Sequence, residues 1–183
     1  MNPEVDTSTE GYSVNEIWDF AEQTRTLLKN YIPRVNQQLM SDVIEDNLIT
    51  GGELVLEAGT GTGKTLAYLL PALIRSVTTG ERVVVSTQTK NLQDQLKESD
   101  LPIAIDLVHR FSNLNDPNST TDRQINVQVL KGKGNYLCLE RWFTVRSAQT
   151  TLQAREARFY ARVATWLEQT STGDSAELYM TSQ

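Results

Sequence analysis

The 183-residue sequence has little of the two side chains that most often hold transition metals, with one cysteine and one histidine. The lone thiol, Cys138, cannot close an internal disulfide, and His109 has no catalytic or metal-binding partner in view. No apolar run approaches the length of about 20 residues that crosses a bilayer. The first residues, MNPEVDTSTEGYSVNE, are acidic and polar, whereas a secretory signal needs a basic start and an apolar stretch. We therefore expect a cytoplasmic protein that contacts no membrane.

Basic residues are in the minority, because 17 lysines and arginines stand against 23 acids, for a net charge of −6. The distribution is uneven. Residues 1–60 hold 11 acids and 3 bases, whereas residues 123–162 hold 8 bases and 2 acids. A chain that is acidic overall can therefore still present a basic face to phosphates. The same charges are also typical of solvated helix surfaces, so charge alone leaves both interpretations open.

The spacing of apolar residues predicts helices and strands in alternation. Helices are expected over residues 14–30, 36–47, 64–79, 89–98 and 147–169. Three short apolar runs predict strands over residues 53–57, 82–87 and 125–129, and residues 112–124 are expected to form a loop. Alternating strands and helices indicate an α/β fold with helices flanking a parallel sheet. Three strands are too few for a complete domain of this class, so we expect part of one.

A phosphate-binding loop follows the first predicted strand. Its motif, G-x-x-x-x-G-K-[ST], is matched at every position but the first by Ala58, Gly59, Thr60, Gly61, Thr62, Gly63, Lys64 and Thr65. Glycines let the backbone curl so that successive N–H groups point at phosphate oxygens, and the following helix adds its N-terminal dipole. Lys64 supplies a positive charge, and the Thr65 hydroxyl is placed to ligate Mg²⁺. These two are the candidate catalytic residues, and all eight are candidate ligands of ATP.

Longer strings around the loop resemble one family. With alanine in its first position, AGTGTGKT is similar to the nucleotide loop of superfamily 2 helicases. The string EAGTGTGKTLAYLLPAL, with PRVNQQLM upstream and VVVSTQTKNLQDQL downstream, resembles the DinG branch of the XPD-like iron–sulfur DNA helicases. The resemblance covers roughly residues 31–142. It implies a partial RecA-like P-loop NTPase domain and the beginning of an inserted helical iron–sulfur domain.

The resemblance also implies roles for residues outside the loop. Gln37 matches the glutamine that reads adenine in this family, with Arg34 three residues before it. The family's contacts to the DNA backbone match Ser86, Thr87, Thr89, Lys90, Asn91 and Gln93. Short hydroxyl and amide donors suit phosphate contacts without base preference, and a helix cap is the alternative for this turn.

The segment KGKGNYLC resembles the entry to the family's iron–sulfur domain. Cys138 matches the first of four thiolate ligands of a [4Fe–4S] cluster, and with no second cysteine it is expected to be a ligand only in a longer chain. Tyr136, Trp142 and Phe143 lie in the same basic segment. They are candidates either to stack on the bases of single-stranded DNA or to form core.

We expect three parts: an N-terminal helix over residues 1–33, a partial motor domain over 34–135, and the truncated start of an iron–sulfur insertion over 136–183. The predicted function is the amino-terminal part of an ATP-dependent DNA helicase. The resemblance implies a monomeric motor that moves 5′-to-3′ on single-stranded or forked DNA. The chain lacks an Asp-Glu-Ala-His or similar element and a second motor domain, so hydrolysis by the chain alone should be very slow.

Two alternatives remain from the sequence. In the first alternative to a helicase, the chain is a truncated, non-catalytic module that binds nucleotide and DNA. In the second, it is an unrelated P-loop NTPase that does not respond to DNA. The segment STQTKNLQDQL argues against the second alternative, since a small-molecule kinase has no need of it.

Overall fold

The protein is described from a computed structural model, which covers residues 12–24, 34–115, 125–148 and 153–180. The chain divides into two compact units, Met1–Gln128 and Val129–Gln183. Each unit has its own hydrophobic core. The predicted division at residues 33 and 135 stays a prediction. Among the described residues, no helix is both long and apolar enough to cross a membrane.

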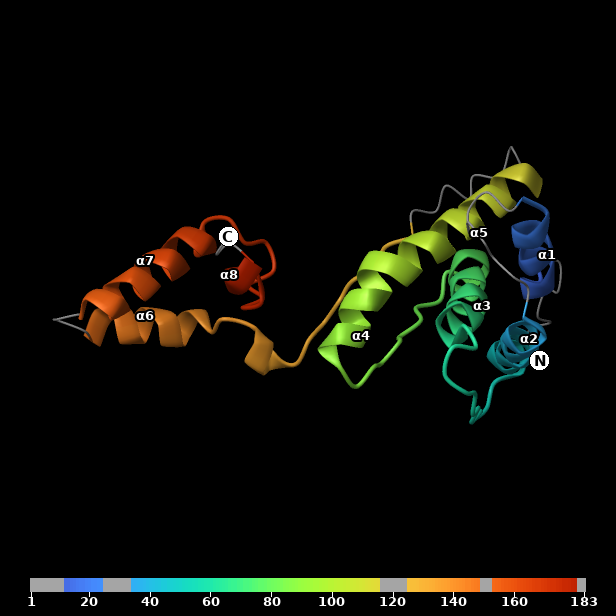
Figure 1. The fold of residues 1–183 in the computed structure, drawn as a ribbon, viewed down its shortest axis with the longest axis horizontal. Coiled ribbons are helices and arrows are strands. Elements are labelled where there is room, and N and C mark those ends of the chain that lie inside the picture. The colour runs from blue at the N-terminus through green and yellow to red at the C-terminus, as the bar shows by residue number, and fades with distance from the viewer. Residues whose placement is uncertain (1–11, 25–33, 116–124, 149–152, 181–183) are drawn as a thin grey trace, which may run out of the picture. The chain divides into compact units, whose positions relative to one another are not determined.

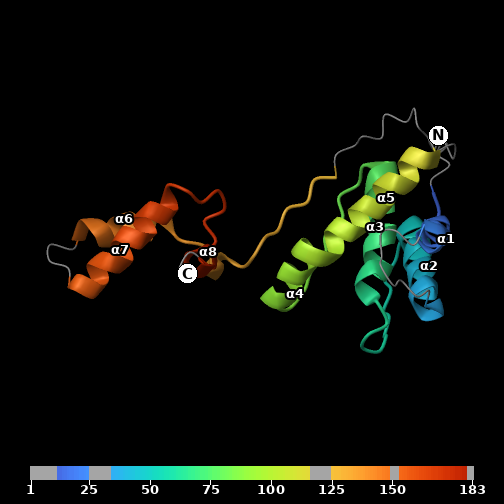
Figure 2. The same ribbon diagram turned by 45° about the horizontal axis from the view of Figure 1, so that its top comes forward.

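The first unit is built from helices (Figure 1). They are α1 (Val14–Thr24), α2 (Val35–Thr50), α3 (Lys64–Thr79), α4 (Lys90–Gln95) and α5 (Leu101–Asn115). One π-helical turn, Leu96–Asp100, joins α4 to α5, so that the three form one continuous rod. Helix α3 lies between α2 and α5, and α1 contacts all three of these helices (Figure 2).

The core of this unit comes from three helices whose apolar residues recur every three or four positions. Its buried members are Val14, Ile17, Trp18 and Ala21 of α1, Leu69, Leu70, Leu73, Ile74 and Val77 of α3, and Ala104, Leu107, Val108 and Phe111 of α5, with Leu96. Each large aliphatic side chain stabilises the fold by roughly 1.5–3 kcal/mol on burial. Helix α2 differs, because the side chains it buries are polar: Gln37 and Ser41.

The predicted helices of the first unit are largely confirmed. Helices α2 and α3 lie on the predicted segments, and α3 ends before Gly80, whose φ of 75° is left-handed. Helix α1 confirms residues 14–24 of its prediction, and residues 25–33 lie outside the described part. The helical rod extends to Asn115, so the loop predicted from residue 112 is wrong there, and residues 116–124 are not described.

The predicted parallel sheet is not formed by the described residues. Segments 53–57, 82–87 and 125–129 run as unpaired chain, drawn without arrows in Figure 1. The one bridge in the described part joins Tyr136 to Asp174. Val55 and Val84 are 94% and 88% exposed, whereas a central parallel strand is buried on both faces. In a sheet, the backbone groups of a strand pair with neighbouring strands, and these segments do not pair with one another. The sheet therefore stays a prediction.

The second unit contains α6 (Leu139–Ala148), α7 (Ala154–Leu167) and α8 (Glu177–Met180), preceded by a 3₁₀ turn at Lys133–Asn135. The predicted single helix over 147–169 is wrong, because α6 ends at Ala148 and α7 begins after Gln153. Gln153 starts α7 in a capping box with Glu156, whose carboxylate accepts from the Gln153 amide at 3.0 Å. The core of the unit is Trp142, Val163, Trp166 and Leu178.

Candidate nucleotide-binding site

The phosphate loop is folded as its glycines predict. Gly61 and Gly63 have φ of 75° and 80°, a left-handed conformation that side chains rarely adopt. Gly63 is the N-cap of α3, and its carbonyl accepts from the Ala67 amide at 3.3 Å. The amides of Lys64, Thr65 and Leu66 therefore have no partner within the helix. Unpaired amides at a helix N-terminus form a site for phosphate.

The carbonyls at the beginning of the loop are held by donors from within the loop. The Lys64 ammonium donates to the carbonyl oxygens of Ala58 at 2.7 Å and Gly59 at 2.9 Å. The Thr62 hydroxyl donates to the same Gly59 oxygen at 3.0 Å. An ammonium has three donors, so Lys64 can turn toward a phosphate by releasing one or both of these carbonyls.

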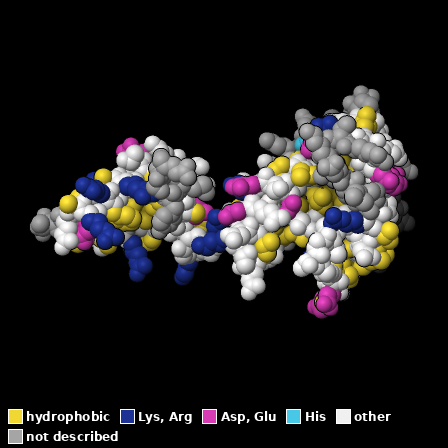
Figure 3. Space-filling model, in the orientation of Figure 1, with side chains coloured by type: hydrophobic (Ala, Val, Ile, Leu, Met, Phe, Trp, Pro, Cys, Tyr) yellow, Lys and Arg dark blue, Asp and Glu magenta, His cyan; other side chains and the backbone are white. Residues whose placement is uncertain are grey.

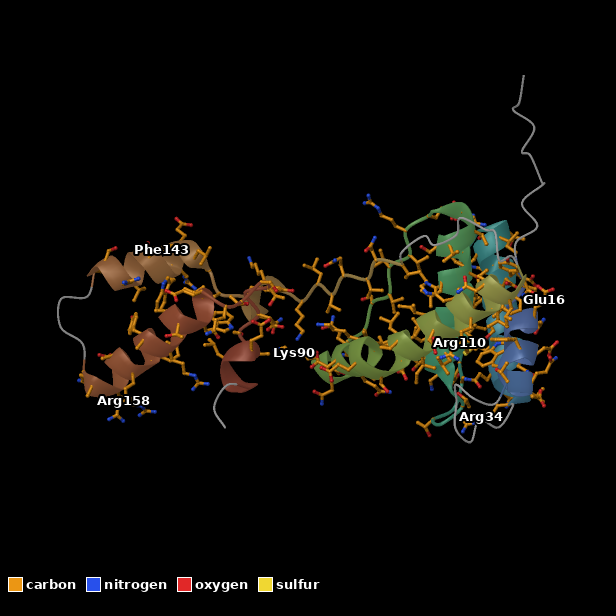
Figure 4. All side chains as sticks on the ribbon, turned by 90° about the horizontal axis from the view of Figure 1, so that it is seen from above. Glu16, Arg34, Lys90, Arg110, Phe143 and Arg158 are labelled. Carbon is orange, nitrogen blue, oxygen red and sulfur yellow. The ribbon has the colours of Figure 1, made fainter. Side chains whose placement is uncertain are left out.

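Helix α2 reaches the other end of the loop from a distant part of the sequence. The Gln37 amide nitrogen donates to the Gly63 carbonyl at 2.8 Å, and Arg34 Nη1 donates to the Gly61 carbonyl. The Gln37 side chain is only 4% exposed. Figure 4 labels Arg34, which lies beside the loop at the start of α2. The two residues predicted to bind nucleotide thus contact the backbone of the loop itself.

Ser41 fixes α2 against its neighbours. This fully buried hydroxyl accepts from the Trp18 indole nitrogen at 3.0 Å. It lies 3.1 Å from the Gln37 carbonyl oxygen and 2.9 Å from the Ala67 carbonyl oxygen, and it can donate its one proton to either. Ser41 therefore joins α1, α2 and α3 one turn away from the phosphate loop.

Thr65, the predicted magnesium ligand, is half-buried in the first turn of α3. It hydrogen-bonds with the hydroxyl of Tyr68, whose pKa is raised by burial. Mg²⁺ at nucleotide sites takes most of its oxygens from phosphates and water and few from protein. One hydroxyl fits that demand, although the described residues include no group of three or more His, Cys, Asp or Glu that could hold a metal by themselves.

A family comparison agrees with this geometry. The model of the DEAD/DEAH box helicases matches residues 34–132, which hold the phosphate loop and both α2 residues that contact it. The chain belongs to the DEAD/DEAH box helicase family. Membership implies a RecA-like P-loop fold for the matched residues.

Individual relatives carry three different names. The chain is 37% identical over 150 residues to the ATP-dependent DNA helicase YoaA of Haemophilus influenzae, covering 82% of this chain and 21% of that protein. It is 43% identical over 108 residues to the ATP-dependent helicase DinG of Mycobacterium tuberculosis, covering 59% of this chain and 15% of that protein. A Staphylococcus epidermidis relative, named 3'-5' exonuclease DinG, is 32% identical over 155 residues, 85% of this chain and 15% of the relative. The predicted DinG-like branch is confirmed, and the chain spans about a fifth or less of these relatives' length.

The segment predicted to contact DNA in this helicase family member lies before and within α4. Thr89 is the N-cap of α4, since its hydroxyl accepts from the Leu92 amide at 3.4 Å, so the cap alternative holds for this residue. The Thr87 hydroxyl donates to the Thr89 carbonyl at 3.3 Å. Ser86, Lys90 and Asn91 are exposed, and Gln93 is half-buried. Their contact with DNA stays a prediction.

The described residues of the second unit do not fit an iron–sulfur cluster. Cys138 is exposed and free, and it is the only cysteine of the sequence, whereas a [4Fe–4S] cluster takes four thiolates. Of the candidate stacking aromatics, Trp142 is core: it is 7% exposed and stacks on Tyr160 with ring centroids 5.2 Å apart. The Tyr136 hydroxyl accepts from the Lys131 amide at 2.8 Å. Phe143 alone of the three is exposed, at 55%.

Proposed function

We propose that the chain is the nucleotide-binding part of a DinG-like, ATP-dependent DNA helicase that acts in the cytoplasm. The observation that carries this proposal is the phosphate loop, whose carbonyls are held by side chains while the first amides of α3 have no helical partner. The names of the relatives, ATP-dependent DNA helicase YoaA and ATP-dependent helicase DinG, support the coupling of ATP to DNA. Family membership removes the alternative of an unrelated P-loop NTPase.

In the proposed site, the residues of the chain bind the phosphates and orient them. The amides of Lys64 and Thr65 and the Lys64 ammonium face the phosphate oxygens, and Thr65 offers its hydroxyl to Mg²⁺. Bound ATP and Mg²⁺ would supply the phosphoryl group and neutralise its charge. The sequence has no Asp-Glu-Ala-His element, so we assign hydrolysis, and the completed parallel sheet, to a longer protein. We assign the iron–sulfur cluster to the same longer protein, because a cluster bound through Cys138 would need three further thiolates.

We assign contacts with single-stranded DNA to two sets of exposed side chains. The first is Ser86, Lys90 and Asn91, before and within α4. The second is an arginine stripe on α7, formed by Arg155, Arg158 and Arg162. These arginines are three and four residues apart, so they share one face of the helix. No carboxylate of the described residues forms an ion pair with them.

The charged surface of the second unit supports this assignment. Figure 3 shows lysine and arginine side chains spread over residues 129–180, with few acidic ones between them. Figure 4 shows the labelled Arg158 and Phe143 pointing to opposite sides of this unit. The arginine stripe therefore acts without Phe143, through contacts with phosphates.

Two binding measurements test the proposed function. The chain with Mg²⁺ should bind a fluorescent, non-hydrolysable ATP analogue, and it should bind a labelled oligo-dT of about 20 nucleotides. Replacing the arginine stripe by glutamine should weaken oligo-dT binding and reduce the salt dependence by about 0.7 in log–log slope per arginine. The matched control replaces Arg75 and Arg110 by glutamine, because these arginines are already paired with Glu81 and Asp106.

The outcomes separate the proposal from its remaining alternative. In a longer protein that continues this chain, single-stranded DNA should stimulate ATP hydrolysis, and Lys64→Ala should remove the stimulation. Nucleotide binding without any DNA-stimulated turnover in that protein would favour the non-catalytic module. No binding of the ATP analogue at all would defeat the proposal.

A further inference from the structure

The contacts between α2 and the phosphate loop are independent of any base. The family resemblance assigns Gln37 to the adenine, yet one of the two N–H groups of its amide already donates to the Gly63 carbonyl at 2.8 Å. With 4% of the side chain exposed, Gln37 lies under the loop rather than open to a ligand. Arg34 donates to the Gly61 carbonyl in the same way.

The approach of Gln37 explains why position 63 has no side chain. A Cβ built on Gly63 would lie 2.3 Å from the Gln37 amide nitrogen and 2.8 Å from its Cδ. The same construction on Gly61 meets nothing within 4 Å, so at that position only the left-handed φ of 75° calls for glycine. Gly63 therefore meets two requirements, its own φ of 80° and the close packing of Gln37.

Holding a carbonyl also aims the next amide. A trans peptide unit is planar, and its N–H points away from its C=O. Fixing the Gly61 carbonyl toward Arg34 therefore directs the Thr62 amide to the opposite side, and fixing the Gly63 carbonyl toward Gln37 does the same for the Lys64 amide. Lys64 holds the Ala58 and Gly59 carbonyls only until it turns to a phosphate, whereas the two α2 contacts can persist with ligand bound.

We propose that Gln37 and Arg34 are positioning residues of the phosphate loop, which hold its carbonyls outward so that its amides face phosphates whatever base the ligand carries. The proposal rests on the proposed function of the loop. It gives Gln37 a task that is distinct from reading adenine. Ser41, one turn after Gln37 in α2, supports the same role, because its contact with the Ala67 carbonyl holds α2 against α3.

Inorganic tripolyphosphate, which has no base, tests the proposal by calorimetric titration with Mg²⁺. Gln37→Met keeps the volume of the side chain and removes its donor. It should weaken tripolyphosphate binding roughly 3- to 10-fold, the effect of one lost hydrogen bond, and weaken ATP by at least that factor. The control is Gln38→Met, the same replacement one residue along α2, which should bind as the unchanged protein does.

The outcomes distinguish this proposal from the function on which it rests. If Gln37→Met weakens ATP but leaves tripolyphosphate unchanged, Gln37 reads only the base and the positioning role is wrong. If the unchanged protein binds neither ligand, the nucleotide site itself is wrong.

A second variant gives a readout in the ligand-free protein. Arg34→Met alters an exposed side chain, so the fold should survive. Its expected effect is a lower backbone order parameter at Thr62 by NMR, with the order parameters inside α5 unchanged. An unaltered order parameter at Thr62 would overturn the role of Arg34.

Discussion

The two units use hydrogen-bonded polar side chains in different ways. In the first, Gln37 and Ser41 of α2 bond to backbone carbonyls of the loop and α3, while the first amides of α3 have no partner within the helix. In the second, Glu177 accepts from the Trp166 indole at 3.0 Å and from the hydroxyls of Thr170 at 2.6 Å and Thr172 at 2.5 Å. Its network is complete in itself. A ligand can bind where hydrogen-bond donors, such as the first amides of α3, are fixed in position but have no acceptor within the helix.

The units also differ in how far apart in sequence their functional groups lie. The phosphate loop needs eight consecutive residues and the helix that follows them, so this chain holds it whole. An iron–sulfur cluster needs four thiolates, and the second unit offers Cys138 alone. A short chain can therefore hold a whole phosphate loop, whereas four thiolates need more cysteines than this sequence has.

The largest expected effect tests whether the two units are independent. Trp166→Ala removes a core side chain of the second unit and should lower the free energy of unfolding of that unit by about 3–5 kcal/mol. ATP affinity should be unchanged, because the core of the first unit shares no residue with this one. Thermal unfolding and calorimetric titration measure the two effects, with Phe159→Ala, which is 59% exposed, as control. If ATP binding were lost when Trp166→Ala unfolds the second unit, the two units would fold as one.

A smaller effect is expected from the loop itself. Lys64→Ala should weaken binding of an ATP analogue by roughly 10- to 100-fold, since a hydrogen bond to a charged group contributes about 1.5–3 kcal/mol. Fluorescence titration of the analogue measures the change. Lys97→Ala, at an exposed position in the π-helical turn, is the control and should bind normally. Equal affinity in the two variants would mean that the loop does not hold phosphates.

Ser41→Ala tests how the first unit holds its polar core. The change leaves the buried Trp18 indole without this acceptor and should lower the free energy of unfolding by about 1–2 kcal/mol. Ser112→Ala provides a matched control, because the Ser112 hydroxyl is also buried but has no hydrogen-bond partner in the described part of the chain. That variant should be neutral or slightly stabilising. Urea unfolding measures the free energy of unfolding of both variants. Equal decreases would mean that the hydrogen bond between Ser41 and Trp18 contributes nothing to stability.

The smallest expected effect is a pH dependence of the second unit. Hydrogen bonds from Thr170, Thr172 and Trp166 lower the pKa of Glu177 below its ordinary value. Because the pKa of Glu177 is lower in the folded unit, its ionised carboxylate stabilises the unit fully above the unfolded pKa of about 4.3. This stabilisation is lost as the pH falls through the folded pKa. Trp166 fluorescence should therefore report loosening of α8 below about pH 4. Glu177→Gln should flatten this dependence, and Glu168→Gln, an exposed acid of the same unit, should retain it.

The spacing of apolar residues predicts α2 and α3 on the segments where the structure has them. It does not give α5 or the break between α6 and α7. Helix α5 went unpredicted, although Ala104, Leu107, Val108 and Phe111 recur at helical spacing and all pack in the core. The single helix expected over 147–169 is interrupted at Gln153, whose extended backbone is the N-cap of α7 and whose amide is capped by Glu156. The strands predicted at 53–57 and 82–87 rest on apolar runs, yet strand pairing depends on partners that no local pattern specifies.

The sequence by itself determined the phosphate loop, because its chemistry depends on contiguous residues: glycines at 61 and 63, a lysine at 64 and a helix that begins there. Only the tertiary structure decided what Gln37, Ser41 and Trp142 do. Gln37 meets Gly63 across 26 positions, Ser41 meets Trp18 across 23, and Trp142 is buried by the later helix α7. Local steric and hydrogen-bonding preferences are written in neighbouring residues, whereas burial and the choice of a distant partner are fixed only when the helices pack.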